Sequence, residues 1–241
     1  MKIAILETGR INEAIASRFD RYPDMFRTMF SRAGADDFEL VTVAVVDGDM
    51  PRSVDDYDGY LVTGSAAGVY DDFDWIEPLM AFLRDAHAAS KPLVGICFGH
   101  QVIAHALGGR TEKWHDGWGL GVYDVALSQA PAWMPEDDST RLIHIHQDQV
   151  VKLPDGARLI GSTDFCVNAM FHIGDTVFCM QGHPEFTPDY TSALMETRAE
   201  VMGKDRVARA DTSLVDGHDG IVIAGWIARF FRQHDNARAA A

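Results

Sequence analysis

Short runs of apolar residues alternate with amphipathic stretches along the first half of the chain. The apolar runs lie at residues 3–6, 40–46, 59–62 and 92–96, and their short length is typical of strands buried on both faces. The stretches between them repeat apolar residues at helical spacing, at 25–33, 76–83 and 102–107. This alternation of strand and helix predicts a doubly wound parallel sheet.

The second half of the chain has a different pattern. Helical periodicity is weak from about residue 110 to residue 180. Strand-like runs replace it at 122–127, 142–145, 158–161, 166–173 and 177–180, and they predict a mixed or antiparallel extension of the sheet. Helices are expected again after Pro188 and at 221–231. Residues 203–219 are polar and rich in Asp and Gly, and we expect a surface connection there.

Length and composition indicate one globular unit. The chain has 241 residues, of which 47% are hydrophobic and 24% charged, and this length buries a core without disulfides or metals. No repeat, low-complexity tract or linker interrupts it, so we expect residues 1–241 to form a single domain. The apolar run at residues 3–6 is followed at once by acidic Glu7, so it is too short for a signal peptide. No stretch reaches the roughly 18–20 apolar residues of a membrane span.

Net charge and cysteine content limit which binding partners, metal sites and cellular locations are expected. The formal net charge is −15, and such a surface repels phosphate backbones and anionic lipid, so we expect no nucleic acid and no membrane partner. The three cysteines, Cys97, Cys166 and Cys179, form no CxxC pair. They therefore indicate neither a disulfide framework nor a zinc site, and reduced thiols favour a cytoplasmic location.

Cys97 lies where a predicted buried strand meets a predicted helix, within the sequence Gly-Ile-Cys-Phe-Gly-His-Gln. A sharp strand-to-helix turn exposes the central side chain, and glycines two residues away on either side relieve crowding in such a turn. The helix dipole favours a thiolate at this position, and the amide of Phe98 is placed to bind an oxyanion. The alternative is a buried structural cysteine.

His183 and Glu185 belong to the sequence Gln-Gly-His-Pro-Glu-Phe, which follows a predicted strand. In this short loop both side chains can turn back to the edge of the sheet. Glu185 would then bind one imidazole nitrogen while the other faces a thiol. The alternative is a polar loop in which Glu185 helps to cap the next helix.

The two motifs, in this order, resemble those of the class I glutamine amidotransferases, in the stand-alone branch similar to the glutaminase domain of GMP synthase. The resemblance implies a Cys97–His183–Glu185 triad. It also implies an α/β fold of the flavodoxin-like type. This is a three-layer sandwich with a mostly parallel central sheet, helices on both faces and a smaller mixed or antiparallel strand extension.

The resemblance also extends to the oxyanion hole. Thr63-Gly64-Ser65 ends a predicted strand, and in the family a backbone amide of this loop completes the hole. The resemblance implies Ser65 first and Gly64 next as the donor, beside Phe98. Ser65 stands where many relatives have a second glycine. The alternative is an ordinary turn after a strand.

Further residues are candidates for substrate binding. Gln101 lies one helical turn after Cys97 on the same face, and the resemblance implies that it contacts the substrate. The resemblance also implies that Trp118 and Gly119 border the substrate pocket, although Trp118 alone is equally consistent with a packing aromatic. His144 and His146 alternate along a predicted strand, and we expect His146 to support the pocket. Two histidines and Asp148 make a metal site conceivable, but no metal is expected, because nothing supplies a further ligand at a recognisable spacing.

An acidic and aromatic stretch at residues 69–74 follows the oxyanion loop. It is consistent with a lid or a site for the substrate's ammonium group, and also with a solvated loop.

The predicted reaction is hydrolysis of a γ-glutamyl amide through a Cys97 thioester, with glutamine or another γ-glutamyl small molecule as substrate and no cofactor. The chain has no P-loop, so an amidotransferase would pass ammonia to a synthetase partner. The alternative is a stand-alone γ-glutamyl peptidase that needs no partner. A third hypothesis is a binding module that keeps the fold without the chemistry, and the presence of all three triad residues disfavours it.

Overall fold

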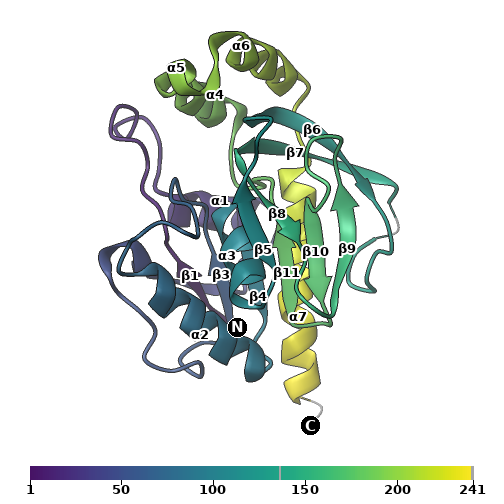
Figure 1. The fold of residues 1–241 in the computed structure, drawn as a ribbon. Coiled ribbons are helices and arrows are strands. Elements are labelled where there is room, and N and C mark those ends of the chain that lie inside the picture. Colours follow the sequence, from purple (N-terminus) through teal and green to yellow (C-terminus); the bar gives the residue numbers. More distant parts are fainter. Residues whose placement is uncertain (136, 240–241) are drawn as a thin grey trace.

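A computed structural model describes residues 1–135 and 137–239 (Figure 1). The strands are β1 (Lys2–Leu6), β2 (Glu39–Val43), β3 (Gly59–Val62), β4 (Leu93–Ile96), β5 (Arg110–Lys113), β6 (Gly119–Leu127), β7 (Ser139–His146), β8 (Asp148–Lys152), β9 (Ala157–Ser162), β10 (Met170–Ile173) and β11 (Val177–Met180). The helices are α1 (Tyr22–Arg32), α2 (Ile76–Ala88), α3 (Phe98–Ala106), α4 (Pro188–Thr197), α5 (Ala199–Met202), α6 (Lys204–Ser213) and α7 (Gly220–Ala239). Two short 3₁₀ helices are η1 (Val45–Asp47) and η2 (Leu214–Asp216).

The main sheet has nine strands in the described residues, in the order β2–β1–β3–β4–β11–β10–β9–β6–β7. The first five in this order pair in parallel, and the remaining pairings from β11 to β7 are antiparallel. The carboxyl ends of β3, β4 and β11 therefore meet at one edge of the sheet. These are the strands that precede the Ser65 loop, Cys97 and His183.

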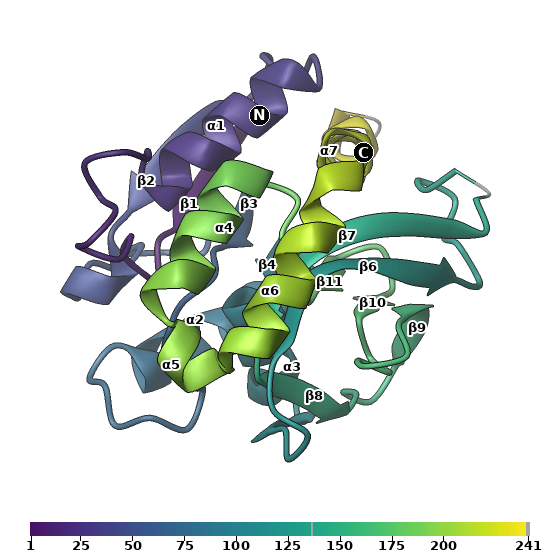
Figure 2. The same cartoon turned by 90° about the horizontal axis from the view of Figure 1, so that it is seen from above.

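Side chains on the two faces of the parallel strands pack against different helices. Ile3 and Ile5 of β1 join a core cluster with apolar residues of α1 and α7, whereas Ala4 and Leu6 join a second cluster with residues of α2 and α3. This alternation follows from the two-residue period of a strand. Figure 2 shows α1 and α7 on one side of the parallel strands and α3 on the other.

Residues 203–219 lie mostly at the surface, as predicted, but the expectation of a connection without helices is wrong for most of this segment. This segment forms α6 and η2, and with α4 and α5 it lies across the end of the molecule opposite the C-terminus (Figures 1 and 2). Ala210 and Leu214 are buried in a third apolar cluster, and the half-buried Val207 packs against it. The apolar residues of α6 are few and separated by charged ones, so tertiary packing rather than local pattern makes this segment helical.

The polar strands β5 and β8 were not predicted, and they pair with each other in a separate two-stranded sheet. In β5 only Thr111 is buried, so no apolar run marks the strand. The strand predicted at 166–173 begins only at Met170. Cys166 instead lies in a turn, where its backbone N–H donates to the hydroxyl of Thr163. Among the described residues, no helix is long and apolar enough to cross a membrane.

The first turn of α3 lies against the backbone of two strands. A Cβ atom added to Gly95 would lie 2.5 Å from the carbonyl oxygen of Gly99, and one added to Gly99 would lie 2.3 Å from the carbonyl oxygen of Val62. Both distances are too short for real atoms. The glycines around Cys97 are therefore required by close packing of helix on sheet.

We expect Gly99→Ala to lower the free energy of unfolding by about 1–3 kcal/mol, because the added methyl group meets strand backbone that cannot move aside. Urea unfolding checks the expectation. Gly225→Ala is the matched control, since a Cβ there meets no atom within 4 Å and the position is helical. The control should unfold at the same or a higher urea concentration. Equal stability of the two variants would contradict the packing argument.

Candidate active site

Cys97 is the residue between β4 and α3, and its backbone is strained. Its φ is +54° and its ψ is −102°, a region that residues with a side chain rarely occupy. Its N–H donates to the carbonyl of Met180 at 2.9 Å, and its own carbonyl accepts from the N–H of Gln101 at 3.0 Å. Such strain persists only where the surroundings fix it, and it is concentrated at functional sites.

His183 and Glu185 lie in the loop after β11, which pairs with β4 and so starts beside Cys97. The Nδ1–H of His183 donates to Oε1 of Glu185 at 2.8 Å, and both side chains are buried. The backbone N–H of His183 donates to the carbonyl of Ile143 at 2.7 Å. Its ring stacks on Phe186 with 3.8 Å between centroids. Contacts of the backbone N–H, of one ring face and of Nδ1 thus fix the position of the His183 imidazole.

The electrostatic setting of His183 favours its charged form. Burial by itself lowers the pKa of this imidazole. The negative charges of Glu185 and Cys97, together with hydrogen bonds to both side chains, outweigh burial and raise the pKa to about 10. The structure therefore brings the three residues of the predicted triad together, with an imidazolium favoured between a thiolate and a carboxylate.

The loop after β3 lies against the same three residues. A Cβ atom added to Gly64 would lie 2.9 Å from Cε1 of His183 and 3.8 Å from Cβ of Cys97. The carbonyl of Gly64 accepts from the hydroxyls of Thr8 at 3.3 Å and Thr63 at 3.1 Å. Across a trans peptide bond the next N–H points the opposite way, so the amide of Ser65 faces away from these threonines. Phe98 is the first residue of α3, where N–H groups have no partner within the helix.

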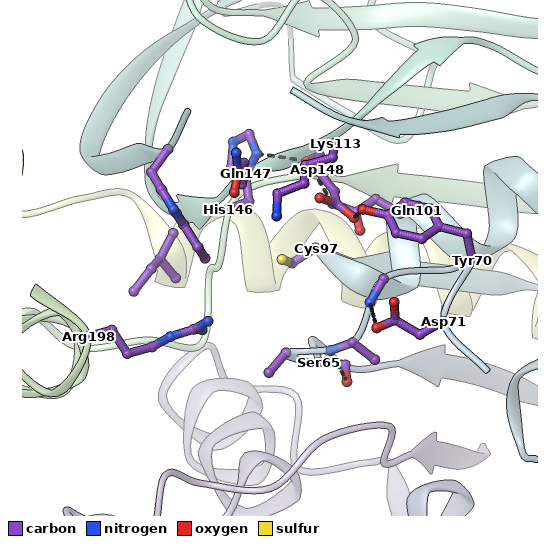
Figure 3. Close-up of a pocket in the computed structure, with 15 residues that line it drawn as sticks. Ser65, Tyr70, Asp71, Cys97, Gln101, Lys113, His146, Gln147, Asp148 and Arg198 are labelled. Carbon is purple, nitrogen blue, oxygen red and sulfur yellow. Dashed lines mark hydrogen bonds between the residues drawn. The ribbon is translucent and has the colours of Figure 1, made fainter. Parts of the chain in front are cut away.

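A hollow of about 250 Å³, here called the Lys113 hollow, opens beside Cys97 (Figure 3). Its lining residues are Ser65, Ala66, Ala67, Gly68, Tyr70, Asp71, Cys97, Gln101, Lys113, Trp118, Ile145, His146, Gln147, Asp148 and Arg198. The predicted residues Gln101, Trp118 and His146 are among them. Gly119 is not, because it lies against the rings of Phe165 and His146 instead.

Hydrogen bonds inside the described chain hold the polar wall of this hollow. The side-chain amide of Gln101 donates to the carbonyl of Asp148 at 2.9 Å and to Gln181 at 3.0 Å. The hydroxyl of Tyr70 donates to the Asp148 carboxylate at 2.7 Å. The acidic and aromatic stretch therefore forms part of the wall through Tyr70 and Asp71, although the Tyr70 side chain is also half exposed.

His144 and His146 point to the same face of β7, as predicted, with Nδ1 of His144 3.1 Å from Nε2 of His146. Burial lowers the pKa of both, that of His146 to about 4, so both are neutral near pH 7. Among the described residues, no group of three or more His, Cys, Asp or Glu side chains is placed to hold a metal ion.

Two cationic residues of the Lys113 hollow were missed by sequence reasoning. Lys113 lies in the unpredicted strand β5, and Arg198 lies between α4 and α5. Neither belongs to a motif. The guanidinium of Arg198 packs over the ring of Trp118 at the site, with 5.0 Å to the centroid.

Comparison with known proteins identifies the family. The sequence profile of the family Glutamine amidotransferase class-I matches residues 26–199, and the chain belongs to this family. Gamma-glutamyl peptidase 3 of Arabidopsis thaliana is 31% identical over 193 residues, which cover 74% of this chain and 74% of the relative. A glutamine-hydrolyzing GMP synthase chain of Halobacterium salinarum is 34% identical over 157 residues, which cover 62% of this chain and 78% of that protein.

Solved structures share the fold. A glutamine amidotransferase from Thermotoga maritima has a TM-score of 0.73 at 17% identity, over 97% of each chain. A glutamine amidotransferase from Methylobacillus flagellatus has a TM-score of 0.69 at 20% identity, over 95% of this chain and 94% of the other. The α/β fold predicted from the sequence, with a large sheet in which antiparallel strands extend a parallel part, is confirmed. The antiparallel part is larger than predicted, since it supplies half of the strand pairings described in the main sheet.

The contact between Gly64 and His183 gives a test of the site. We expect Gly64→Ala to reduce the rate of amide hydrolysis about 100-fold, because the methyl group displaces the imidazole from the thiol. Steady-state kinetics measures the rate, and urea unfolding shows whether the fold persists. An active Gly64→Ala protein would show that the imidazole position is not critical.

Proposed function

We propose that this chain hydrolyses the side-chain amide of glutamine, or the corresponding bond of a γ-glutamyl amide, through a thioester at Cys97. The observation that carries the proposal is the buried His183–Glu185 pair beside a cysteine on a strained strand-to-helix turn. This combination supplies a nucleophile, a proton carrier and a residue that orients the carrier. The reaction needs no cofactor.

In the first half-reaction the Cys97 thiolate attacks the γ-carbonyl carbon, and the carbonyl oxygen becomes an oxyanion. When the tetrahedral intermediate collapses, the C–N bond breaks and the imidazolium of His183 gives its proton to the leaving amine. In the second half-reaction His183 takes a proton from water, which attacks the thioester carbon. The C–S bond breaks and the γ-glutamyl acid departs, while Cys97 returns as a thiolate beside protonated His183.

The amides of Phe98 and Ser65 are the proposed oxyanion donors. Two observations support this choice. The N–H of Phe98 is at the beginning of α3, and the peptide between Gly64 and Ser65 is turned by two threonine hydroxyls so that its N–H points away from them. This orientation favours Ser65 over Gly64 as the second donor.

The Lys113 hollow is the proposed site for the γ-glutamyl group. Among its lining residues, Lys113 and Arg198 carry positive charges, and Asp71 and Asp148 carry negative charges. A hollow with both signs of charge suits the α-carboxylate and α-ammonium groups of such a substrate. Trp118 and His146 form further parts of the wall, and Gly119 lies close to the ring of His146.

The fate of the released amine has two candidate answers. A glutamine amidotransferase passes ammonia to a synthetase partner, and similarity to a glutamine-hydrolyzing GMP synthase chain supports this answer. A γ-glutamyl peptidase releases a larger amine and needs no partner, and similarity to gamma-glutamyl peptidase 3 supports this one.

A panel of substrates tests the proposal and separates the two answers. The purified chain is expected to hydrolyse at least one of glutamine, γ-glutamyl amides and γ-glutamyl dipeptides. Cys97→Ala should lower kcat at least about 1,000-fold, because the nucleophile is removed. Hydrolysis of dipeptides faster than of glutamine indicates the peptidase. Turnover that survives Cys97→Ala would refute the thioester route.

The pH dependence should follow His183. Because its pKa is raised from the ordinary value to about 10, the imidazolium is present at neutral pH and is lost as the pH rises through about 10. We therefore expect kcat/KM to fall on the alkaline side, where the proton for the leaving amine is missing. Profiles of kcat/KM against pH measure this fall.

Glu185→Gln gives the control for the pH profile. The variant removes a carboxylate charge that raises the pKa of His183, so the alkaline fall should move to lower pH. We expect kcat/KM near pH 7 to drop about 10- to 1,000-fold. An alkaline limb that stays in place would contradict the proposed role of Glu185.

A further inference from the structure

Cys97 lies between two hollows. The second one, here called the His183 hollow, has a volume of about 170 Å³. Its lining residues are Arg10, Asn12, Tyr22, Gly64, Ser65, Ala66, Cys97, Ile145, His183, Phe186, Leu194 and Arg198. Cys97 belongs to both hollows, whereas the imidazole of His183 lines only this one.

The position of His183 assigns a role to each hollow. The residue that protonates the leaving amine must be on the side to which the amine departs. The acyl group stays on the sulfur and occupies the other side. If the proposed hydrolysis is correct, the Lys113 hollow holds the γ-glutamyl group and the His183 hollow receives the leaving amine.

The His183 hollow is larger than ammonia requires. A water-sized molecule needs about 10–15 Å³ of cavity volume, whereas this hollow provides about 170 Å³. Its wall includes the apolar side chains of Ile145, Phe186 and Leu194. These features suit a leaving group with carbon atoms of its own.

Besides the imidazolium of His183, the positive charge that a ligand meets in this hollow is that of Arg198, which lines both hollows. Arg10 also lines it, but this guanidinium pairs with the carboxylates of Glu7 and Asp47. In the described part of the chain Arg198 forms no ion pair and no side-chain hydrogen bond, and its guanidinium is held over Trp118. An unpaired, positioned arginine is a binding group for a carboxylate. It stands out in a chain whose net charge is −15.

Tyr22 adds a neutral donor. Its hydroxyl accepts a hydrogen bond from the hydroxyl of Tyr190 at 3.2 Å, which leaves its own proton to donate. Burial raises the pKa of Tyr22 to about 12, so the hydroxyl stays protonated at neutral pH. A hydroxyl donor and a guanidinium thus line the same hollow.

We infer that the His183 hollow is a leaving-group subsite for amino acids or short peptides that carry a free carboxylate, and that Arg198 binds this carboxylate. The inference rests on the proposed function and narrows it to γ-glutamyl peptides. It makes Arg198 a specificity-determining residue for the leaving group.

Two substrates that differ only in that carboxylate give the test. They are γ-glutamyl-alanine and γ-glutamyl-alaninamide. Wild-type protein should prefer the first by about 10-fold or more in kcat/KM, because a charge-assisted pair forms with only one of them. Arg198→Gln should reduce the preference to within about 3-fold of unity, and Arg198→Lys should keep part of it. The control Arg209→Gln removes the same charge from an exposed site outside the hollow and should keep the full preference.

Binding to the Cys97→Ala protein separates this inference from the proposed function. Calorimetry with the same two dipeptides should show a Kd ratio of about 10 or more, which Arg198→Gln in the same background abolishes. If the Kd ratio is observed but the wild-type protein hydrolyses neither dipeptide, the proposed hydrolysis is refuted and the subsite is not. Two results would overturn the subsite. The first is hydrolysis by the wild-type protein with no preference between the two dipeptides. The second is an Arg198→Gln protein whose affinity falls by the same factor for both dipeptides, so that the Kd ratio is unchanged. The second result would place Arg198 against the γ-glutamyl group.

Discussion

The close packing of α3 on β3 and β4 is the constraint from which the geometry of the site follows. Cys97 keeps a backbone conformation that residues with side chains avoid, because the glycines on either side let the helix begin directly on strand backbone. The strands that precede Gly64 and His183, β3 and β11, are the immediate neighbours of β4 in the sheet. Their carboxyl ends therefore deliver the remaining groups to the same edge. Gly64 completes this packing, since only a residue without a Cβ atom leaves room for the imidazole.

The buried charges of the site support one another. Burial opposes the charge on His183, and the adjacent carboxylate and thiolate, with their hydrogen bonds, reverse that effect. Glu185 binds the imidazole through Oε1, and its Oε2 has no hydrogen-bond partner among the described residues. Removing one member of such a group leaves the others buried without compensation, which costs more than the pair contributes. The three residues are thus coupled energetically as well as chemically.

Local chemistry in the sequence was sufficient for part of this arrangement. The strand-to-helix turn at Cys97 is visible because paired glycines and an apolar strand are neighbours in the chain. His183 and Glu185 could be assigned to the site because their motif follows that turn in the order that the family resemblance requires. Arg198 and Lys113 could not be found in this way, because they reach the site through an unpredicted strand and through contact with Trp118. The helix α6 was missed for the same reason: its few apolar residues become informative only when packed against β6 and α4.

The segment from α4 to α6 places Arg198 in a part of the fold that is separate from the edge of the sheet. Cys97 and His183 lie at the edge of the sheet, whereas Arg198 lies between the helices α4 and α5. The guanidinium of Arg206, in α6, donates to the backbone carbonyl of Trp118. The family profile ends at residue 199, where α5 begins, so α6 lies beyond it. If Arg198 selects the leaving amine as proposed, a substitution in the segment from α4 to α6 changes that choice without altering Cys97, His183 or Glu185.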